Sequence, residues 1–143
     1  ELMCGFHGLD DPRGKAEQTA ALLGLTPVMT KRAKTLSGGF QRRLSIAMAL
    51  VGDPEILFLD EPTLGLDVLA RSDLWDLIRS LKGKVTVILT THYMQEAEAL
   101  SDRIGIMKDG RLLICGTAPE IKAAAGCDEL EQAFVQIVKG AKK

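Results

Sequence analysis

Two short apolar runs separated by an amphipathic stretch constrain the fold of this chain more than any other feature. Residues 56–59 form a continuous apolar run that ends in Asp60 and Glu61, and residues 84–90 form a second run rich in β-branched side chains. Between them, residues 68–81 place large apolar side chains at helical spacing. The pattern predicts a strand, a helix and a parallel strand, with the first strand buried on both faces of its sheet. The fold class is therefore α/β.

The flanking segments predict further short elements. A helix is expected to begin at Ser37 and to stop at a Gly-Asp-Pro sequence, residues 52–54. The dipeptide Asp109-Gly110 between two apolar runs predicts a β-hairpin. Residues 1–36 and 117–143 read as short helices, the second segment with a frayed end. We expect a division into residues 1–52, 53–116 and 117–143.

Composition excludes several classes of protein. The chain has 143 residues, a formal net charge of -1 and a pI near 6.2, so it lacks the basic field that nonspecific nucleic-acid binding requires. Its three cysteines show neither metal-ligand nor CxxC spacing, which is typical of reduced thiols. Its apolar runs are far shorter than the roughly 20 residues that span a bilayer.

Polar side chains follow both predicted strands. Asp60 and Glu61 end the first strand, and His92 follows the second. Because ligands of open parallel sheets bind at the carboxyl ends of the strands, we expect these three residues at one edge. Side chains alternate along a strand, so one carboxylate could hold a metal while the other orients water. The alternatives are a solvated loop for the carboxylates and a cap or a packed ring for the histidine.

The sequence Ser37-Gly38-Gly39 opens a predicted helix. Two glycines leave the backbone amides of a helix N-terminus uncovered, and the helix dipole attracts an anion there. The segment is thus a candidate phosphate site. A plain N-cap with flexible glycines is the alternative.

Together these segments resemble the ABC-type ATPases. LSGGFQRR at residues 36–43 is similar to the signature motif, ILFLDEPT at 56–63 to Walker B, GLD at 65–67 to the D-loop and TTH at 90–92 to the H-loop, in the order and spacing of the family. The resemblance implies a P-loop NTPase-like (RecA-like) parallel sheet with a helical signature subdomain. It also implies ATP and Mg²⁺ as cofactors.

The resemblance assigns roles to individual residues. Asp60 would hold Mg²⁺ through water, Glu61 would be the general base that polarises the attacking water, and His92 would contact the γ-phosphate. Asp67 would cross a dimer interface. Ser37, Gly38 and Gly39 would bind the γ-phosphate of an ATP held by a partner head. Phe40 departs from the family, because many members have a polar glutamine or glutamate at this position.

A P-loop, or Walker A motif, is not found in these residues. The nearest string, from Gly8 to Lys15, has five residues between its glycines, continues with Ala16 after the lysine, and contains two aspartates that would repel phosphate. In the family the P-loop precedes the segment with which this sequence starts. We therefore expect roughly the first third of the head to be missing, an exposed edge on the strand at 84–90, and a fragment that neither hydrolyses ATP nor stays well folded.

Weaker similarity points to a branch of the family. Residues 91–104, 116–122 and 128–137 look like drug- and lipid-exporting heads related to daunorubicin-resistance ATPases and to the A-subfamily. The resemblance implies a second head and a transmembrane permease as partners at the cytoplasmic face of the cell membrane, without nucleic acid. The alternatives are a non-transport ABC ATPase and a non-catalytic remnant that acts as an interaction module. The transported substrate is not readable from this chain.

Overall fold

The computed structural model describes residues 2–8 and 10–141, which form two compact units. One unit covers residues 1–90 and the other residues 91–143, and each is described by itself below. The frayed end expected at Lys142 and Lys143 lies outside the described residues. The three-part functional division at 52/53 and 116/117 stays a prediction.

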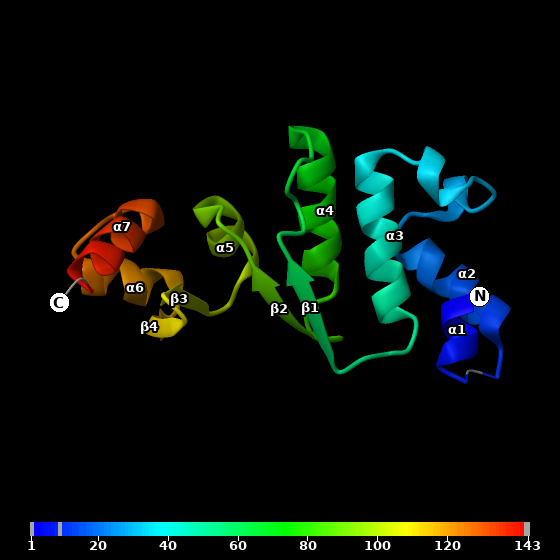
Figure 1. Ribbon diagram of the computed structural model, residues 1–143, viewed down its shortest axis with the longest axis horizontal. Helices are drawn as coiled ribbons and strands as arrows, with labels where there is room; N and C mark the ends of the chain where they lie inside the picture. The colour runs from blue at the N-terminus through cyan, green and yellow to red at the C-terminus, as the bar shows by residue number, and fades with distance from the viewer. Residues whose placement is uncertain (1, 9, 142–143) are drawn as a thin grey trace. The chain divides into compact units, whose positions relative to one another are not determined.

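The first unit begins with helices, as the sequence predicts. They are α1 (Leu2–Phe6), α2 (Pro12–Leu22), the 3-10 turns η1 (Thr26–Val28) and η2 (Ala33–Thr35), and α3 (Gly38–Leu50). In Figure 1 α3 lies between the α1–α2 pair and α4 (Val68–Ser80), and it packs against both α2 and α4. The predicted stop of α3 is confirmed, because the helix ends just before residues 52–54.

The predicted β-α-β unit is confirmed. Strand β1 (Ile56–Asp60) pairs in parallel with β2 (Thr86–Thr90), and α4 connects them. Strand β2 starts two residues later than the sequence pattern suggests, because the amides of Lys84 and Val85 bond back to the carbonyl of Leu81 at the end of α4, at 3.0 and 3.3 Å. Register pairs Asp60 with Thr90 at the carboxyl ends of the two strands.

The burial of β1 on both faces was predicted wrongly. Leu57 and Leu59 are buried, whereas Phe58 is 71% exposed and Ile56 is 50% exposed. The cause is the small sheet: within residues 2–8 and 10–141, β1 and β2 pair only with each other, and one face of the pair stays open to solvent. On the buried face the core side chains of α4 are confirmed as Leu74, Leu77, Ile78 and Leu81.

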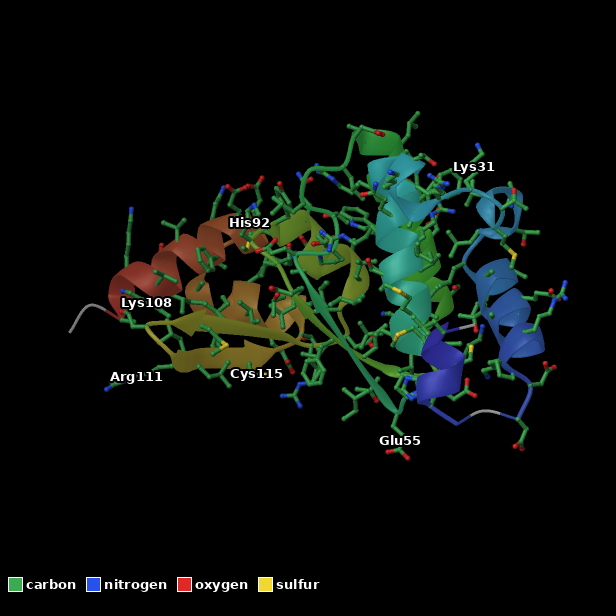
Figure 2. The ribbon with its side chains drawn as sticks, turned by 45° about the vertical axis from the view of Figure 1, so that its right-hand side comes forward. Lys31, Glu55, His92, Lys108, Arg111 and Cys115 are labelled. Carbon is green, nitrogen blue, oxygen red and sulfur yellow. The ribbon has the colours of Figure 1, made fainter. Side chains whose placement is uncertain are left out.

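The second unit contains the predicted hairpin. Helix α5 (Met94–Leu100) precedes β3 (Ile104–Lys108) and β4 (Arg111–Gly116), which pair antiparallel. Asp109 and Gly110 both have positive φ, 49° and 74°, as the favoured two-residue turn requires. Figure 2 labels Lys108 and Arg111 on either side of this turn. Helices α6 (Ala118–Ala125) and α7 (Leu130–Gly140) complete the unit.

The core of the second unit comes from four of its elements. Its buried members are Ala97, Ile106, Ile121, Leu130 and Ala133. The turn and the hairpin are also tied to the last helix, because the Lys108 ammonium donates to the carbonyl of Val138 at 2.9 Å. None of the helices in the described residues combines the length and the hydrophobicity that a bilayer-spanning segment requires.

Candidate functional site

The carboxyl ends of β1 and β2 are joined at two points. The Thr90 hydroxyl donates to the Asp60 carboxylate, and the Glu61 amide donates to the Thr90 carbonyl at 3.0 Å. The Asp60 side chain nevertheless stays exposed. Glu55, labelled in Figure 2, marks the amino end of β1, the end of the strand opposite to Asp60. The sequence therefore placed the acidic pair correctly, at the carboxyl edge of a parallel pair.

Glu61 departs from strand geometry. Strand β1 ends at Asp60, and Glu61 adopts φ of 45°, in the left-handed region. For a residue other than glycine this conformation costs about 1–3 kcal/mol and persists only when its surroundings hold it. The argument from strand alternation therefore does not extend to Glu61. The two carboxylates differ because one ends the strand and the other begins a turn.

Three hydrogen bonds fix the backbone of Glu61. Its amide bonds to Thr90, as above, and its carbonyl accepts from the Leu64 amide at 3.2 Å and from Nη2 of Arg42 at 3.0 Å. A carbonyl oxygen has two lone pairs, so both acceptor positions are used. The turn, the sheet and helix α3 thus converge on the backbone of one residue.

A groove of about 250 Å³ lies next to Asp60 and Pro62, the two neighbours of Glu61 in the chain. Arg42 of α3 lines it together with Phe58 and Asp60 of β1. Because Phe58 and Asp60 sit on the open face of the strand pair, the groove gives solvent and small ligands access to the Asp60 carboxylate.

The start of α3 is open. Ser37 is at the N-cap position with an extended backbone, and within the described part of the chain its hydroxyl caps no amide of the helix. A Cβ built on Gly38 would lie 3.5 Å from Leu66 Cδ2, and one on Gly39 would lie 3.3 Å from Ala70 Cβ. The glycines of the signature motif therefore lie against the D-loop and the first turn of α4.

Asp67 begins α4. Its carboxylate accepts from the Ala70 amide at 2.9 Å, an N-cap bond that holds the exposed side chain in place. Asp67 thus has a structural role within this chain. A role across a dimer interface stays a prediction.

Phe40 packs within the same unit. The guanidinium of Arg43 lies over its ring at 5.8 Å from the centroid, and Arg43 also pairs with Asp73 of α4 at 3.0 Å. The cation–π contact lies within α3, and it is the ion pair of Arg43 with Asp73 that connects α3 to α4.

His92 belongs to the second unit, at the segment that leads into α5 (Figure 2). It is exposed, and its ring lies 4.0 Å from the ring of Tyr93, whose amide donates to the Thr91 hydroxyl at 3.0 Å. Asp60, Glu61, Ser37, Gly38 and Gly39 belong to the first unit. Their convergence with His92 stays a prediction.

The residues at the carboxyl edge fit a hydrated Mg²⁺. This ion keeps several waters and binds through one or two carboxylates plus phosphate oxygens. Asp60 offers one exposed carboxylate, whose position is set by Thr90. In the described residues there is no group of three or more His, Cys, Asp and Glu that could hold a metal, so nucleotide and water would have to supply the other ligands.

Two residues of this site were not identified from the sequence. Thr90 was part of the TTH string without a role, and its register opposite Asp60 depends on strand pairing. Arg42 was part of the signature string, and its bond to Glu61 spans 19 positions. A basic residue one turn after the glycines was the only available signal.

Comparisons with known proteins agree with the motifs. Residues 9–64 match the family described as ABC transporter. "Daunorubicin resistance ATP-binding protein DrrA3" of Streptomyces coeruleorubidus is 44% identical over 134 residues, which are 92% of this chain and 42% of that protein. "Phospholipid-transporting ATPase ABCA3" of Homo sapiens is 42% identical over 112 residues, 78% of this chain and 7% of that protein.

Solved structures show the same fold. A structure described as an ATP-binding subunit of an ABC transporter superposes with a TM-score of 0.77 at 26% identity, covering 96% of this chain and 59% of that chain. The chain spans less than half the length of the two curated relatives. The fold, the motif order and the sequence similarity together show that this chain belongs to the ABC transporter ATP-binding family, in its A-subfamily-like branch.

Proposed function

We propose that this chain is the C-terminal part of an ATPase head that powers export of a drug, a lipid or another small molecule. ATP and Mg²⁺ are the cofactors. Asp60 holds the hydrated Mg²⁺, Glu61 acts as the general base for the attacking water, and His92 contacts the γ-phosphate. Ser37, Gly38 and Gly39 bind the γ-phosphate of an ATP on a second head, and Asp67 lies at the interface between the heads.

The joined strand ends are the observation that carries the proposal. Asp60 and Glu61 are both bonded to Thr90, the first residue of the TTH motif. Phosphoryl transfer depends on positioning and on charge stabilisation more than on covalent chemistry. In this scheme the exposed Asp60 carboxylate holds the Mg²⁺ that neutralises phosphate charge, and the hydrogen-bonded backbone of Glu61 positions the second carboxylate for the water.

The partners are inferred from the relatives. The names of two similar proteins refer to daunorubicin resistance and to phospholipid transport. We infer that a transmembrane permease determines the substrate, and that the head works as a dimer on the cytoplasmic face of the membrane. Selectivity then lies outside these residues.

The experiment is the substitution Glu61→Gln in the intact ATPase. We expect ATP binding to be retained and turnover to fall by at least about 100-fold, because a general base contributes about 10²- to 10⁴-fold. Binding is measured by equilibrium titration and turnover by phosphate release. Full turnover in Glu61→Gln would remove Glu61 from the mechanism.

Glu55→Gln is the matched control. Glu55 is exposed and lies at the opposite end of β1. The same loss of charge at this position should leave both ATP binding and turnover unchanged. A parallel loss in Glu55→Gln would show that the strand, and not the base, responds to the substitution.

A further inference from the structure

Helix α3 carries two features, the glycines at its N-terminus and an arginine that contacts Glu61. Its first residues are Gly38 and Gly39, after Ser37 at the N-cap. Arg42 follows one helical turn later and donates to the carbonyl of Glu61 at 3.0 Å. Since a helix moves as a rigid element over one turn, the position of its N-terminus and the position of the Arg42 side chain are linked.

The contact of Arg42 with Glu61 differs from the contact that the neighbouring Arg43 makes. Arg43 pairs with the carboxylate of Asp73, which is 66% exposed, and so joins two helices at the surface. Arg42 is only partly exposed, and it binds a backbone oxygen in the turn that follows β1. A guanidinium stays charged at all relevant pH values and offers several donors, so this bond does not depend on titration.

The conformation of Glu61 makes that bond consequential. A left-handed residue other than glycine is held by its surroundings, and here the holding bonds come from Thr90, Leu64 and Arg42. Two of the three lie within the sheet edge and the turn. The third comes from α3, and it couples the helix that begins with the signature glycines to the backbone carbonyl of Glu61.

We propose that Arg42 is a positioning residue for Glu61, which it holds in the left-handed conformation and whose placement it links to the N-terminus of α3. The proposal rests on the role of Glu61 as the general base. Arg42 touches neither substrate nor the reacting water in this scheme. It sets the direction of the carboxylate through the backbone, so that displacement of α3 is felt at the base.

The test compares Arg42→Met with Arg42→Lys in the intact ATPase. Arg42→Met keeps the aliphatic stem and removes the donors. We expect kcat to fall about 10- to 100-fold with KM for ATP nearly unchanged, because misplacing a catalytic group by about 1 Å can cost about 100-fold. Arg42→Lys keeps one charged donor and should recover part of kcat.

Amide hydrogen exchange distinguishes a local change at Glu61 from a loss of stability of the whole protein. In Arg42→Met the Glu61 amide, which is bonded to Thr90, should exchange faster, while amides in the middle of α3 and α4 keep their protection. Arg79→Met is the matched control, since Arg79 pairs with Asp76 in the last turn of α4 at 2.8 Å. It should change neither kcat nor exchange at Glu61.

The outcomes separate the two proposals. Normal kcat in Arg42→Met with an inactive Glu61→Gln overturns the role of Arg42 alone, whereas normal turnover in Glu61→Gln overturns the proposed function. The role of Arg42 would also be overturned if kcat fell and exchange became equally faster throughout α3. In that case Arg42 would only stabilise the fold. Should Arg42→Met not fold, Arg42→Gln is subject to the same criteria.

Discussion

The N-termini of α3 and α6 show two opposite uses of the same helix end. At α6 the Glu120 amide donates to the Thr117 hydroxyl at 3.4 Å, and the Glu120 carboxylate accepts from the Thr117 amide at 2.8 Å. This reciprocal pair is a capping box. At α3 the corresponding residue, Ser37, is followed by two glycines, and its side chain bonds to no amide of the helix within residues 10–141.

The difference separates stability from binding. The closed end of α6 satisfies its amides with side chains of its own helix, which stabilises the second unit and leaves little for a ligand. The open end of α3 forgoes that stabilisation and keeps its amides and the positive end of its dipole accessible. The capping box of α6 therefore serves as the reference against which the uncapped start of α3 is interpreted as a binding site.

The largest effect is expected from a negative charge placed at the open N-terminus of α3. In Gly38→Asp the new Cβ has room, because it would lie 3.5 Å from Leu66 Cδ2, an ordinary contact. An acidic residue in the first turn favours a helix, by about 0.3–1 kcal/mol, but it repels phosphate. We expect ATP turnover of the intact ATPase to fall at least about 100-fold while stability is unchanged or higher.

Phosphate release and thermal unfolding measure the two quantities for Gly38→Asp. Gly38→Ala is the control for added volume without charge, and it should retain more turnover than the aspartate. Wild-type turnover in Gly38→Asp would remove this helix end from the nucleotide site.

A smaller effect compares the two caps directly. Thr117→Ala removes a bonded cap and should lower the free energy of unfolding by about 1 kcal/mol, with ATP turnover unchanged. Ser37→Ala removes an unbonded hydroxyl at the matched position and should change stability by only a few tenths of a kcal/mol. Urea unfolding of both variants decides. Equal destabilisation would mean that Ser37 caps its helix in solution.

The smallest effect is a pH dependence at the closed end. The hydrogen bonds from the Thr117 amide and the Thr117 side chain hold the pKa of Glu120 below its usual value. A lowered pKa in the folded state means stability that is present above the unfolded-state pKa and is lost as the pH falls through the folded-state pKa. Glu120→Gln should lack this loss.

Unfolding of the wild type and of Glu120→Gln at a series of acidic pH values measures it. The stability advantage of the wild type should shrink steadily as the pH falls. Parallel pH profiles would show that Glu120 is not bonded in solution, and that the capping box adds nothing ionic to the second unit.

Local signals in the sequence predicted most of the elements. The Asp109-Gly110 turn, the helix stop at residues 52–54 and the apolar spacing of α4 depend on neighbours a few positions away, and the structure confirms all three. The position of Asp60 and Glu61 at a strand end was also predictable, because they follow a continuous apolar run and are themselves followed by a proline. Residue types at neighbouring positions were sufficient to predict these features.

Contacts between residues far apart in the sequence could not be predicted from the pattern of residue types. The burial of β1 was predicted for both faces, because an apolar run does not say how many elements cover it. The left-handed conformation of Glu61 had no signal, since glutamate is not a residue that favours it. The bonds of Arg42 and Thr90 to the acidic pair span 19 and 30 positions, and only the packing of α3 and the strand register bring them about.

The sequence by itself determined the fold class, the order of the motifs and the family, because these follow from residue type and spacing. The tertiary structure decided which hydrogen bonds fix the acidic pair and which helix end stays open. The physical reason is that a hydrogen bond requires its donor and acceptor within about 3 Å, and such distances between remote residues exist only after the chain has packed.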